Sequence, residues 1–218
     1  FLPEAMVNYL ARLGWAHGDQ EVFTREELIR LFDLRQVGAT PAIFDRTKLE
    51  WLNQVWMKRF AGDPKTREDL ADRFSPYLLP LGVRDPAKTL LVNAVTHLAT
   101  RATTLVEMAP KARFYFEDPK EYDATALGKL AGPAFGPRLD RLIARLAALE
   151  PWTDVDLEGA CRQLASELGV KLVDLAQPMR LALTGETASP PVFAIMAALG
   201  PETTLRRLRA LRARVPRA

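Results

Sequence analysis

Few residues in this chain of 218 could carry catalysis. Cys161 is the one cysteine, and it shares a helical face with Leu157 and Leu164, which predicts a core thiol rather than a nucleophile. His17 and His97, the two histidines, lie far apart in the sequence and offer little from which to build a metal centre. Phosphate-binding GxxxxGKS/T and GxGxxG loops and the HExxH motif do not occur. We therefore expect no catalytic residue, metal or cofactor in this chain.

A first candidate for binding is a polar stripe formed by Asn93, His97 and Arg101. Their spacing of four residues places them along one side of a helix. The opposite side, expected to be buried, carries Leu91, Val95, Leu98 and Ala102. A solvated helix surface explains such a stripe, but a stripe ending in Arg can also present a guanidinium to the edge of a nucleobase. Both interpretations stay open on the pattern alone.

A second candidate surrounds Arg180, which is followed by a helix exit at Thr184-Gly185 and by the sequence Ser189-Pro190-Pro191. The prolines predict a stiff, exposed turn beside the arginine. Rigid loops of this kind, combined with apolar or Arg stacking, are typical of proteins that read single-stranded bases.

A third candidate is the basic C-terminal helix. Leu205, Leu208, Leu211 and Val215 share one arc, and arginines that include Arg206 and Arg209 occupy the others. The net charge of the whole chain is only +3, whereas residues 201–218 alone sum to +5. Nucleic-acid binding would thus depend on local patches, with the arginines either solvated or forming a rim that contacts phosphates.

The elements that would position these residues are helices. Apolar spacing and capping signals, such as the capping box at Thr24 and Glu27, predict helices almost everywhere, and strand-like alternation and hairpin turns are essentially missing. The predicted helices span residues 3–13, 24–32, 45–60, 67–79, 86–101, 104–116, 123–149 with an interruption at Gly132-Pro133, 154–168 and 170–183, followed by two short helices divided at Gly200-Pro201. The expected fold class is all-α.

Composition and breaks in the pattern bound the architecture. Hydrophobic residues make up 48% of the chain and charged residues 26%, as in globular proteins, and no apolar run reaches the length of a membrane span. Gly62-Asp63-Pro64 predicts the first domain boundary. Because the chain starts at Phe1 without an initiator Met or a signal-peptide pattern, it is expected to be a piece of a longer protein.

Several sequence blocks together resemble bacterial glutamyl-tRNA synthetases. The run FLPEAMVNYLARLGWAHGDQ from Phe1 is similar to the segment that follows the KMSKS loop in that family. The later blocks FTREEL, KLEWLN, PKARFYF, QPMR and ALTG continue the likeness over nearly the whole chain. Glutaminyl-tRNA synthetases share the catalytic ancestry, but their anticodon domains are β-barrels, which a helical sequence cannot supply.

The resemblance implies the C-terminal part of a class I aminoacyl-tRNA synthetase. The Rossmann domain, the HIGH motif, the acceptor-end domain and the KMSKS loop would be missing. What remains would be a helical stem-contact domain (1–64) and two helical anticodon-binding subdomains (65–117 and 118–218).

The resemblance also implies roles for individual residues. Arg101 aligns with the residue that faces the third anticodon base, where Arg is associated with accepting C and rejecting G. Arg180 aligns with an arginine that contacts the first two anticodon bases. Ser189, Pro190 and Val192 fall where a loop packs against the first base, although Pro191 replaces a usual Gly and Val192 a usual Leu. Asn93, His97, Arg206 and Arg209 are further possible contacts with the tRNA.

The function that follows from the resemblance is recognition of the anticodon of a glutamate tRNA. The parent would be a cytoplasmic, monomeric glutamate–tRNA ligase that uses ATP, Mg²⁺ and glutamate, while this part alone would be inactive and would bind tRNA but neither DNA nor membranes. The alternative is a helical protein-interaction module whose basic tail docks on an acidic partner. Sensitivity to a single anticodon base separates the two hypotheses.

Overall fold

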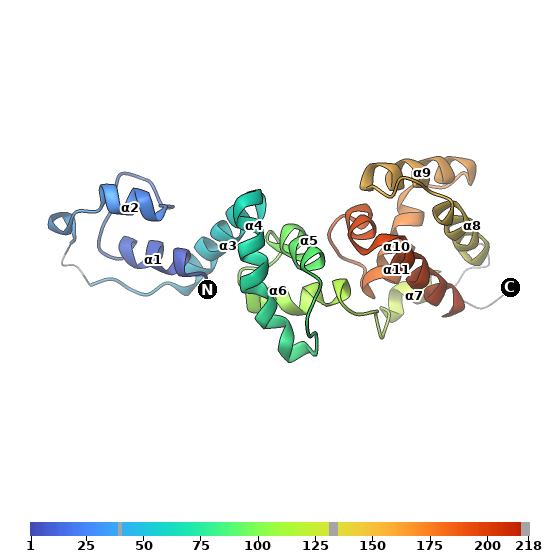
Figure 1. Ribbon diagram of the computed structural model, residues 1–218, viewed down its shortest axis with the longest axis horizontal. Helices are drawn as coiled ribbons and strands as arrows, with labels where there is room; N and C mark the ends of the chain where they lie inside the picture. The colour runs from blue at the N-terminus through green and yellow to red at the C-terminus, as the bar shows by residue number, and fades with distance from the viewer. Residues whose placement is uncertain (39–40, 131–134, 215–218) are drawn as a thin grey trace. The chain divides into compact units, whose positions relative to one another are not determined.

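The structure is a computed structural model that describes residues 1–38, 41–130 and 135–214 (Figure 1). Helices and short 3₁₀ segments account for all the regular structure of these ranges, which confirms the predicted all-α class. The chain divides into two compact units, residues 1–112 and 113–218. No helix of the described ranges is long and apolar enough to cross a membrane.

The first unit contains six α-helices among its described residues. These and the intervening 3₁₀ segments are α1 (Pro3–Arg12), α2 (Arg25–Leu31), η1 (Leu34–Gln36), α3 (Arg46–Gly62), α4 (Pro64–Phe74), η2 (Ser75–Leu81), α5 (Lys88–Leu98) and α6 (Leu105–Ala112). The predicted capping box of α2 is present: the Thr24 hydroxyl accepts from the Glu27 N–H, and the Glu27 carboxylate accepts from the Thr24 N–H.

The predicted break at Gly62-Asp63-Pro64 is a tight corner inside the first unit. α3 ends at Gly62 and α4 begins at Pro64, with the Asp63 carboxylate accepting from the Lys65 N–H. Residues on both sides of the corner therefore belong to one compact unit, and the three-part division into 1–64, 65–117 and 118–218 stays a prediction.

Buried side chains of α3 hold the first unit together. Leu49, Leu52 and Trp56 are buried as their spacing predicts, and Asn53 is fully buried among them. The Asn53 side chain accepts from the Leu2 N–H (2.7 Å) and donates to the Thr103 carbonyl (2.6 Å). A buried amide with both ends satisfied fixes these two distant segments to α3.

The second unit packs its helices around one apolar cluster. The elements are η3 (Arg113–Tyr115), α7 (Ala124–Leu130), α8 (Phe135–Ala147), α9 (Asp154–Glu167), α10 (Val173–Thr184) and α11 (Val192–Arg214). Cys161 lies in the cluster with no exposed surface, and burial raises the pKa of its thiol to about 12, which confirms the predicted core cysteine.

The predicted division of the last helix is also confirmed. Gly200 has non-helical backbone angles (φ 77°, ψ 170°) and kinks α11 directly before Pro201. The predicted interruption at Gly132-Pro133 and the predicted apolar position Val215 lie outside the described residues.

Candidate nucleic-acid interface

Arg101 lies in a turn beyond its predicted helix. α5 ends at Leu98, and the Arg101 N–H donates to the Leu98 carbonyl at 2.8 Å, so the prediction of one helical stripe through Arg101 was wrong. After the turn, Thr103 and Thr104 bond to Glu107 and cap the start of α6: the Thr104 hydroxyl accepts from the Glu107 N–H at 3.1 Å. Asn93 and His97 remain on α5, both half-buried.

The buried side of this segment is as predicted. Leu91, Val95, Leu98 and Ala102 are all at most 3% exposed. Arg101 itself is exposed, and its guanidinium has no hydrogen bond or ion pair with any residue that the structure describes. The turn therefore combines a fixed apolar underside with one outward cation.

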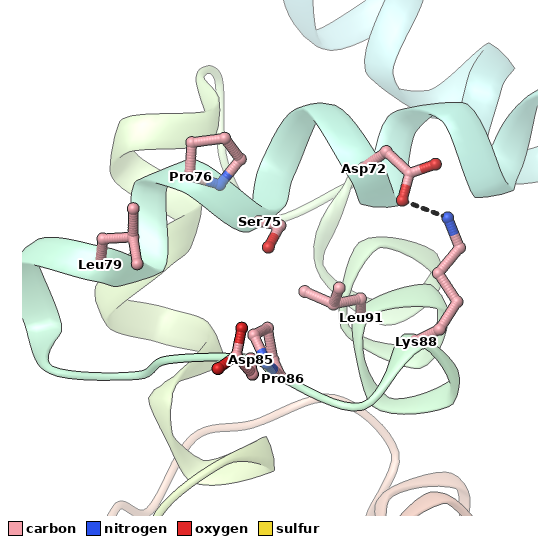
Figure 2. A pocket seen from close by; sticks show the side chains of 8 residues that line it. All are labelled: Asp72, Ser75, Pro76, Leu79, Asp85, Pro86, Lys88 and Leu91. Carbon is pink, nitrogen blue, oxygen red and sulfur yellow. Dashed lines mark hydrogen bonds and ion pairs between the residues drawn. The ribbon is translucent and has the colours of Figure 1, made fainter.

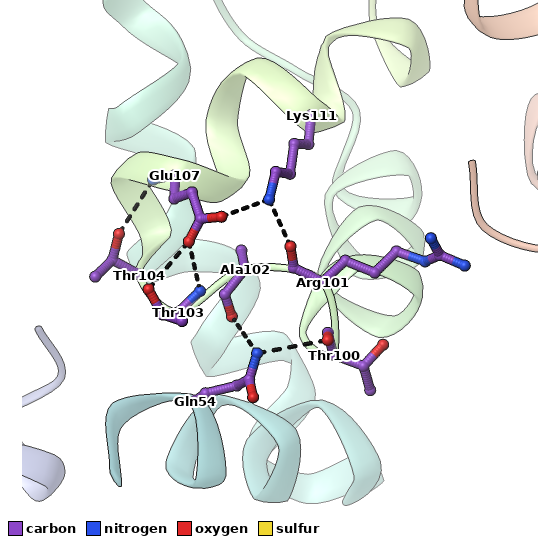
Figure 3. Close-up of polar contacts among 8 residues, drawn as sticks. All are labelled: Gln54, Thr100, Arg101, Ala102, Thr103, Thr104, Glu107 and Lys111. Atoms are coloured by element: carbon purple, nitrogen blue, oxygen red, sulfur yellow. Dashed lines mark hydrogen bonds and ion pairs between the residues drawn. The ribbon is translucent and has the colours of Figure 1, made fainter. Parts of the chain in front are cut away.

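Side chains from two helices hold the backbone of the Arg101 turn (Figure 3). From α3, Gln54 donates to the carbonyls of Thr100 (3.4 Å) and Ala102 (3.1 Å). From α6, the Lys111 ammonium donates to the carbonyl of Arg101 at 2.6 Å. The Arg101 side chain points away from these contacts in Figure 3.

Glu107 links the two ends of the turn. Its carboxylate accepts from the Thr103 N–H (2.7 Å) and hydroxyl (3.0 Å) and forms an ion pair with Lys111. The hydrogen bond from Lys111, together with the one from the Thr103 N–H, lowers the pKa of Glu107 to about 2. The carboxylate is thus ionised at neutral pH and engaged by Lys111.

Arg180 and Ser189 are brought together in the second unit, as the sequence predicts. The Arg180 Nε donates to the Ser189 hydroxyl at 2.9 Å, and that hydroxyl donates to the Pro190 carbonyl at 2.8 Å. Both side chains are half-buried. The guanidinium is therefore tied to the loop that follows its helix.

The predicted helix exit at Thr184-Gly185 shapes the start of this loop. Gly185 has a left-handed backbone (φ 79°), and a Cβ there would lie only 2.7 Å from the Glu121 carbonyl oxygen. The Asp123 N–H donates to the Gly185 carbonyl at 2.9 Å. A glycine is required at this place because of both its φ and the neighbouring backbone.

Pro190 and Val192, which follow Ser189 in the sequence, are both buried. Pro190 is buried, and Val192 opens α11 with a side chain that is 4% exposed and belongs to the apolar cluster of the second unit. Pro191 is exposed. The accessible groups here are those of Arg180, Ser189 and Pro191, so packing of a base against Pro190 or Val192 stays a prediction that their burial does not favour.

The C-terminal arginines differ from one another. Arg206 and Arg209 are exposed, as predicted, but Arg206 forms an ion pair with Asp118. Arg212 pairs with Asp140 (2.9 Å). Part of the basic charge of this helix is thus balanced by carboxylates of the same unit, which the local count of charges did not anticipate.

Arg207 is a structural residue that sequence reasoning missed. It is 3% exposed and donates to the Asp118 carboxylate (2.8 Å) and to the carbonyls of Phe114 (2.7 Å), Glu117 (2.9 Å) and Leu183 (2.7 Å). Burial lowers the pKa of Arg207 to about 10, so the guanidinium stays charged at neutral pH. Its position four residues before Leu211, on the buried side, was the available signal.

A separate pocket of about 480 Å³ lies in the first unit (Figure 2). Its lining residues are Asp72, Ser75, Pro76, Leu79, Asp85, Pro86, Lys88 and Leu91. Lys88 forms an ion pair with Asp72 across one wall. None of the predicted binding residues lines this pocket. Among the described residues, no group of three or more His, Cys, Asp or Glu side chains could hold a metal ion.

The chain is similar to a set of glutamate–tRNA ligases. It is 43% identical over 207 residues to the glutamate–tRNA ligase of Syntrophobacter fumaroxidans, and the matched residues cover 95% of this chain and 43% of the relative. It is 44% identical over 215 residues to glutamate–tRNA ligase 1 of Methylorubrum extorquens, covering 96% and 45%. The chain thus spans less than half the length of these relatives.

A solved structure and two family models agree with this likeness. The crystal structure of a glutamate tRNA ligase from Elizabethkingia meningosepticum in complex with its amino acid superposes with a TM-score of 0.85 at 25% identity, over 99% of this chain and 42% of that one. The model of the catalytic domain of class I (E and Q) tRNA synthetases matches residues 1–51. The model of the anticodon binding domain matches residues 69–212. The predicted resemblance is confirmed, and the chain belongs to the family of anticodon binding domains.

Proposed function

We propose that this chain recognises the anticodon of a glutamate tRNA as the C-terminal part of a glutamate–tRNA ligase. The observation that carries the proposal is the exposed guanidinium of Arg101, which has no partner among the described residues and projects from a turn held by α3 and α6. The match to an anticodon binding domain over residues 69–212 supports this use of the surface.

The chemistry of arginine favours C over G at the third anticodon base. A guanidinium offers donors only, and the pairing edge of C presents two acceptors, O2 and N3. G turns its N1 and N2 donors toward the same place. Arg180, half-buried against Ser189, would contact the first two bases. Asn93, His97, Arg206 and Arg209 would be further contacts with the tRNA, with nearby basic side chains holding phosphates.

The parent enzyme would join glutamate to this tRNA with ATP and Mg²⁺ in the cytoplasm. The chain itself would supply tRNA positioning and no catalytic residue, and it would act as a monomer without binding DNA or membranes. The match of residues 69–212, the larger part of the chain, to an anticodon binding domain supports this division of labour.

The proposal is tested by fluorescence anisotropy of this chain with a labelled glutamate tRNA and with the same tRNA in which the last anticodon base is changed from C to G. We expect the C form to bind more tightly by about 1–3 kcal/mol, the usual scale for one wrong base. Arg101→Gln is expected to remove most of the difference. Two salt concentrations separate this effect from general attraction to phosphates.

Equal binding of the two tRNAs by the unmodified chain would contradict the proposal. It would leave a basic surface without base preference, as the protein-interaction alternative requires. A full preference for C that remained in Arg101→Gln would contradict the role of Arg101, because the preference would then have another source.

A further inference from the structure

Discrimination by Arg101 requires that its backbone be fixed. An arginine side chain has several rotatable bonds and could follow a displaced base if its Cα atom were also free to move. Recognition of one base edge over another demands a donor held to within about half an ångström. Since the guanidinium has no partner of its own in the described structure, any such control must come through the turn that carries it.

The backbone carbonyl of Arg101 accepts a hydrogen bond from a side chain. The bond comes from Lys111, at 2.6 Å, and spans ten residues of sequence between the turn and the last turn of α6. Gln54, from α3, holds the carbonyls of Thr100 and Ala102 on either side. The Lys111 bond is therefore the contact that acts on Arg101 itself.

Glu107 fixes Lys111 and completes a closed loop of contacts. The Glu107 carboxylate accepts hydrogen bonds from the N–H and the hydroxyl of Thr103 and forms an ion pair with the Lys111 ammonium. The ammonium in turn donates to the Arg101 carbonyl (Figure 3). Residues 101 and 103 are thus bridged through one ion pair of α6.

We propose that Lys111, held by Glu107, is a positioning residue for the recognition of the third anticodon base by Arg101. This inference rests on the proposed function. It predicts that loss of the Lys111 bond lowers base discrimination even though Arg101 and its charge remain. General attraction to tRNA phosphates falls only as far as one lost positive charge requires.

The chain offers a matched control in Lys88. This lysine also donates to a backbone carbonyl, that of Glu68 at 2.9 Å, and pairs with a carboxylate, that of Asp72 (Figure 2). Its side chain is 41% exposed, against 42% for Lys111. Lys88→Met and Lys111→Met therefore remove the same charge and the same kinds of bond from the first unit, but only Lys111 touches the Arg101 turn.

The experiment measures dissociation constants for the C and G forms of the tRNA with the unmodified chain, Lys111→Met, Lys88→Met, Lys111→Arg and Arg101→Gln. The quantity compared is the ratio of the G to the C constant, in which any uniform loss of charge or of folded protein cancels. We expect Lys111→Met to lower the ratio roughly threefold to tenfold, through weaker binding of the C form. Lys88→Met is expected to leave the ratio unchanged, and Lys111→Arg to restore most of it.

A double variant supplies the specific signature of positioning. If Lys111 acts through Arg101, Lys111→Met added to Arg101→Gln lowers the ratio no further. An unchanged ratio in Lys111→Met, or an equal fall in Lys88→Met, overturns the inference while leaving the proposed function intact. A ratio of one in the unmodified chain overturns both, so the two failures are distinguishable.

Discussion

Arg101 in the first unit is held through the backbone of its turn, whereas Arg180 in the second unit is held through its guanidinium. The turn of Arg101 is fixed by side chains of α3 and α6, and the Arg101 guanidinium has no hydrogen bond or ion pair with a described residue. Arg180 sits within a helix, whose backbone needs no such support, and its guanidinium is tied to Ser189 at 2.9 Å. Replacement of Arg101 should therefore alter recognition alone, whereas replacement of Arg180 should also disturb the loop that follows its helix.

The largest effect is expected at Arg207, which donates to the carbonyl of Leu183 in α10, the helix that carries Arg180. Arg207→Met leaves three main-chain carbonyls, including that of Leu183 at the end of α10, without the Arg207 donor, and leaves the Asp118 carboxylate with Arg206 alone. We expect the second unit to lose about 3 kcal/mol or more of unfolding free energy. Hydrogen exchange in increasing urea, followed separately for α3–α6 and α8–α11, measures the loss in each unit.

Arg206→Met is the control for this prediction. Arg206 pairs with the same Asp118 but is exposed, so its removal should cost no more than about 1 kcal/mol. Similar losses for the two variants, or a loss in the first unit, would show that Arg207 does not hold the second unit as its contacts indicate.

An intermediate effect on stability is expected for Arg180, and it should exceed that for Arg101. Arg180→Met removes the bond to Ser189 and should destabilise the second unit by about 1 kcal/mol. Arg101→Met removes no hydrogen bond or ion pair with a described residue and should change the stability of the first unit by less than about 0.5 kcal/mol. Urea unfolding of the two variants without RNA checks both values, and equal losses would remove the contrast between the two arginines.

The smallest effect concerns the acid sensitivity of the Arg101 turn. The pKa of Glu107 is about 2 in the folded chain, below its ordinary value of 4.5. A lowered carboxyl pKa contributes stability that is complete above pH 4.5 and is lost as the pH falls toward 2. The stability difference between the unmodified chain and Glu107→Gln should thus shrink over that window, as thermal unfolding at several pH values would reveal. A difference that stays constant would contradict the role of the charged carboxylate.

Local signals predicted much of this fold. The capping box at Thr24, the break between helices at Asp63 and the kink at Gly200 each depend on residues only a few positions apart, and all three are found where the sequence places them. The exit at Gly185 and the contact between Arg180 and Ser189 belong to the same class, because nine residues separate the two partners. Such features can be read from one stretch of chain.

The features that sequence reasoning missed depend on distant partners. The buried Arg207 pairs with Asp118, which lies 89 positions away in the sequence. The turn of Arg101 is supported by Gln54, which lies 46 positions before Thr100 and 48 before Ala102. The end of α5 was misplaced because its apolar side continues through Ala102 although the helix does not. Apolar spacing reports burial, and it cannot distinguish a helix from a turn that packs on the same core.

Arg206 and Arg207 share one carboxylate, that of Asp118, and this affects how strongly tRNA binding by the C-terminal helix would depend on salt concentration. One carboxylate already faces two guanidiniums, and Asp140 faces that of Arg212. Cations released from RNA on binding are displaced by protein charges that are not already neutralised. The ionic-strength dependence of tRNA binding should therefore report fewer displaced ions than the number of arginines in this helix. Arg209 and Arg214, which are both exposed, are the clearest contributors among those described.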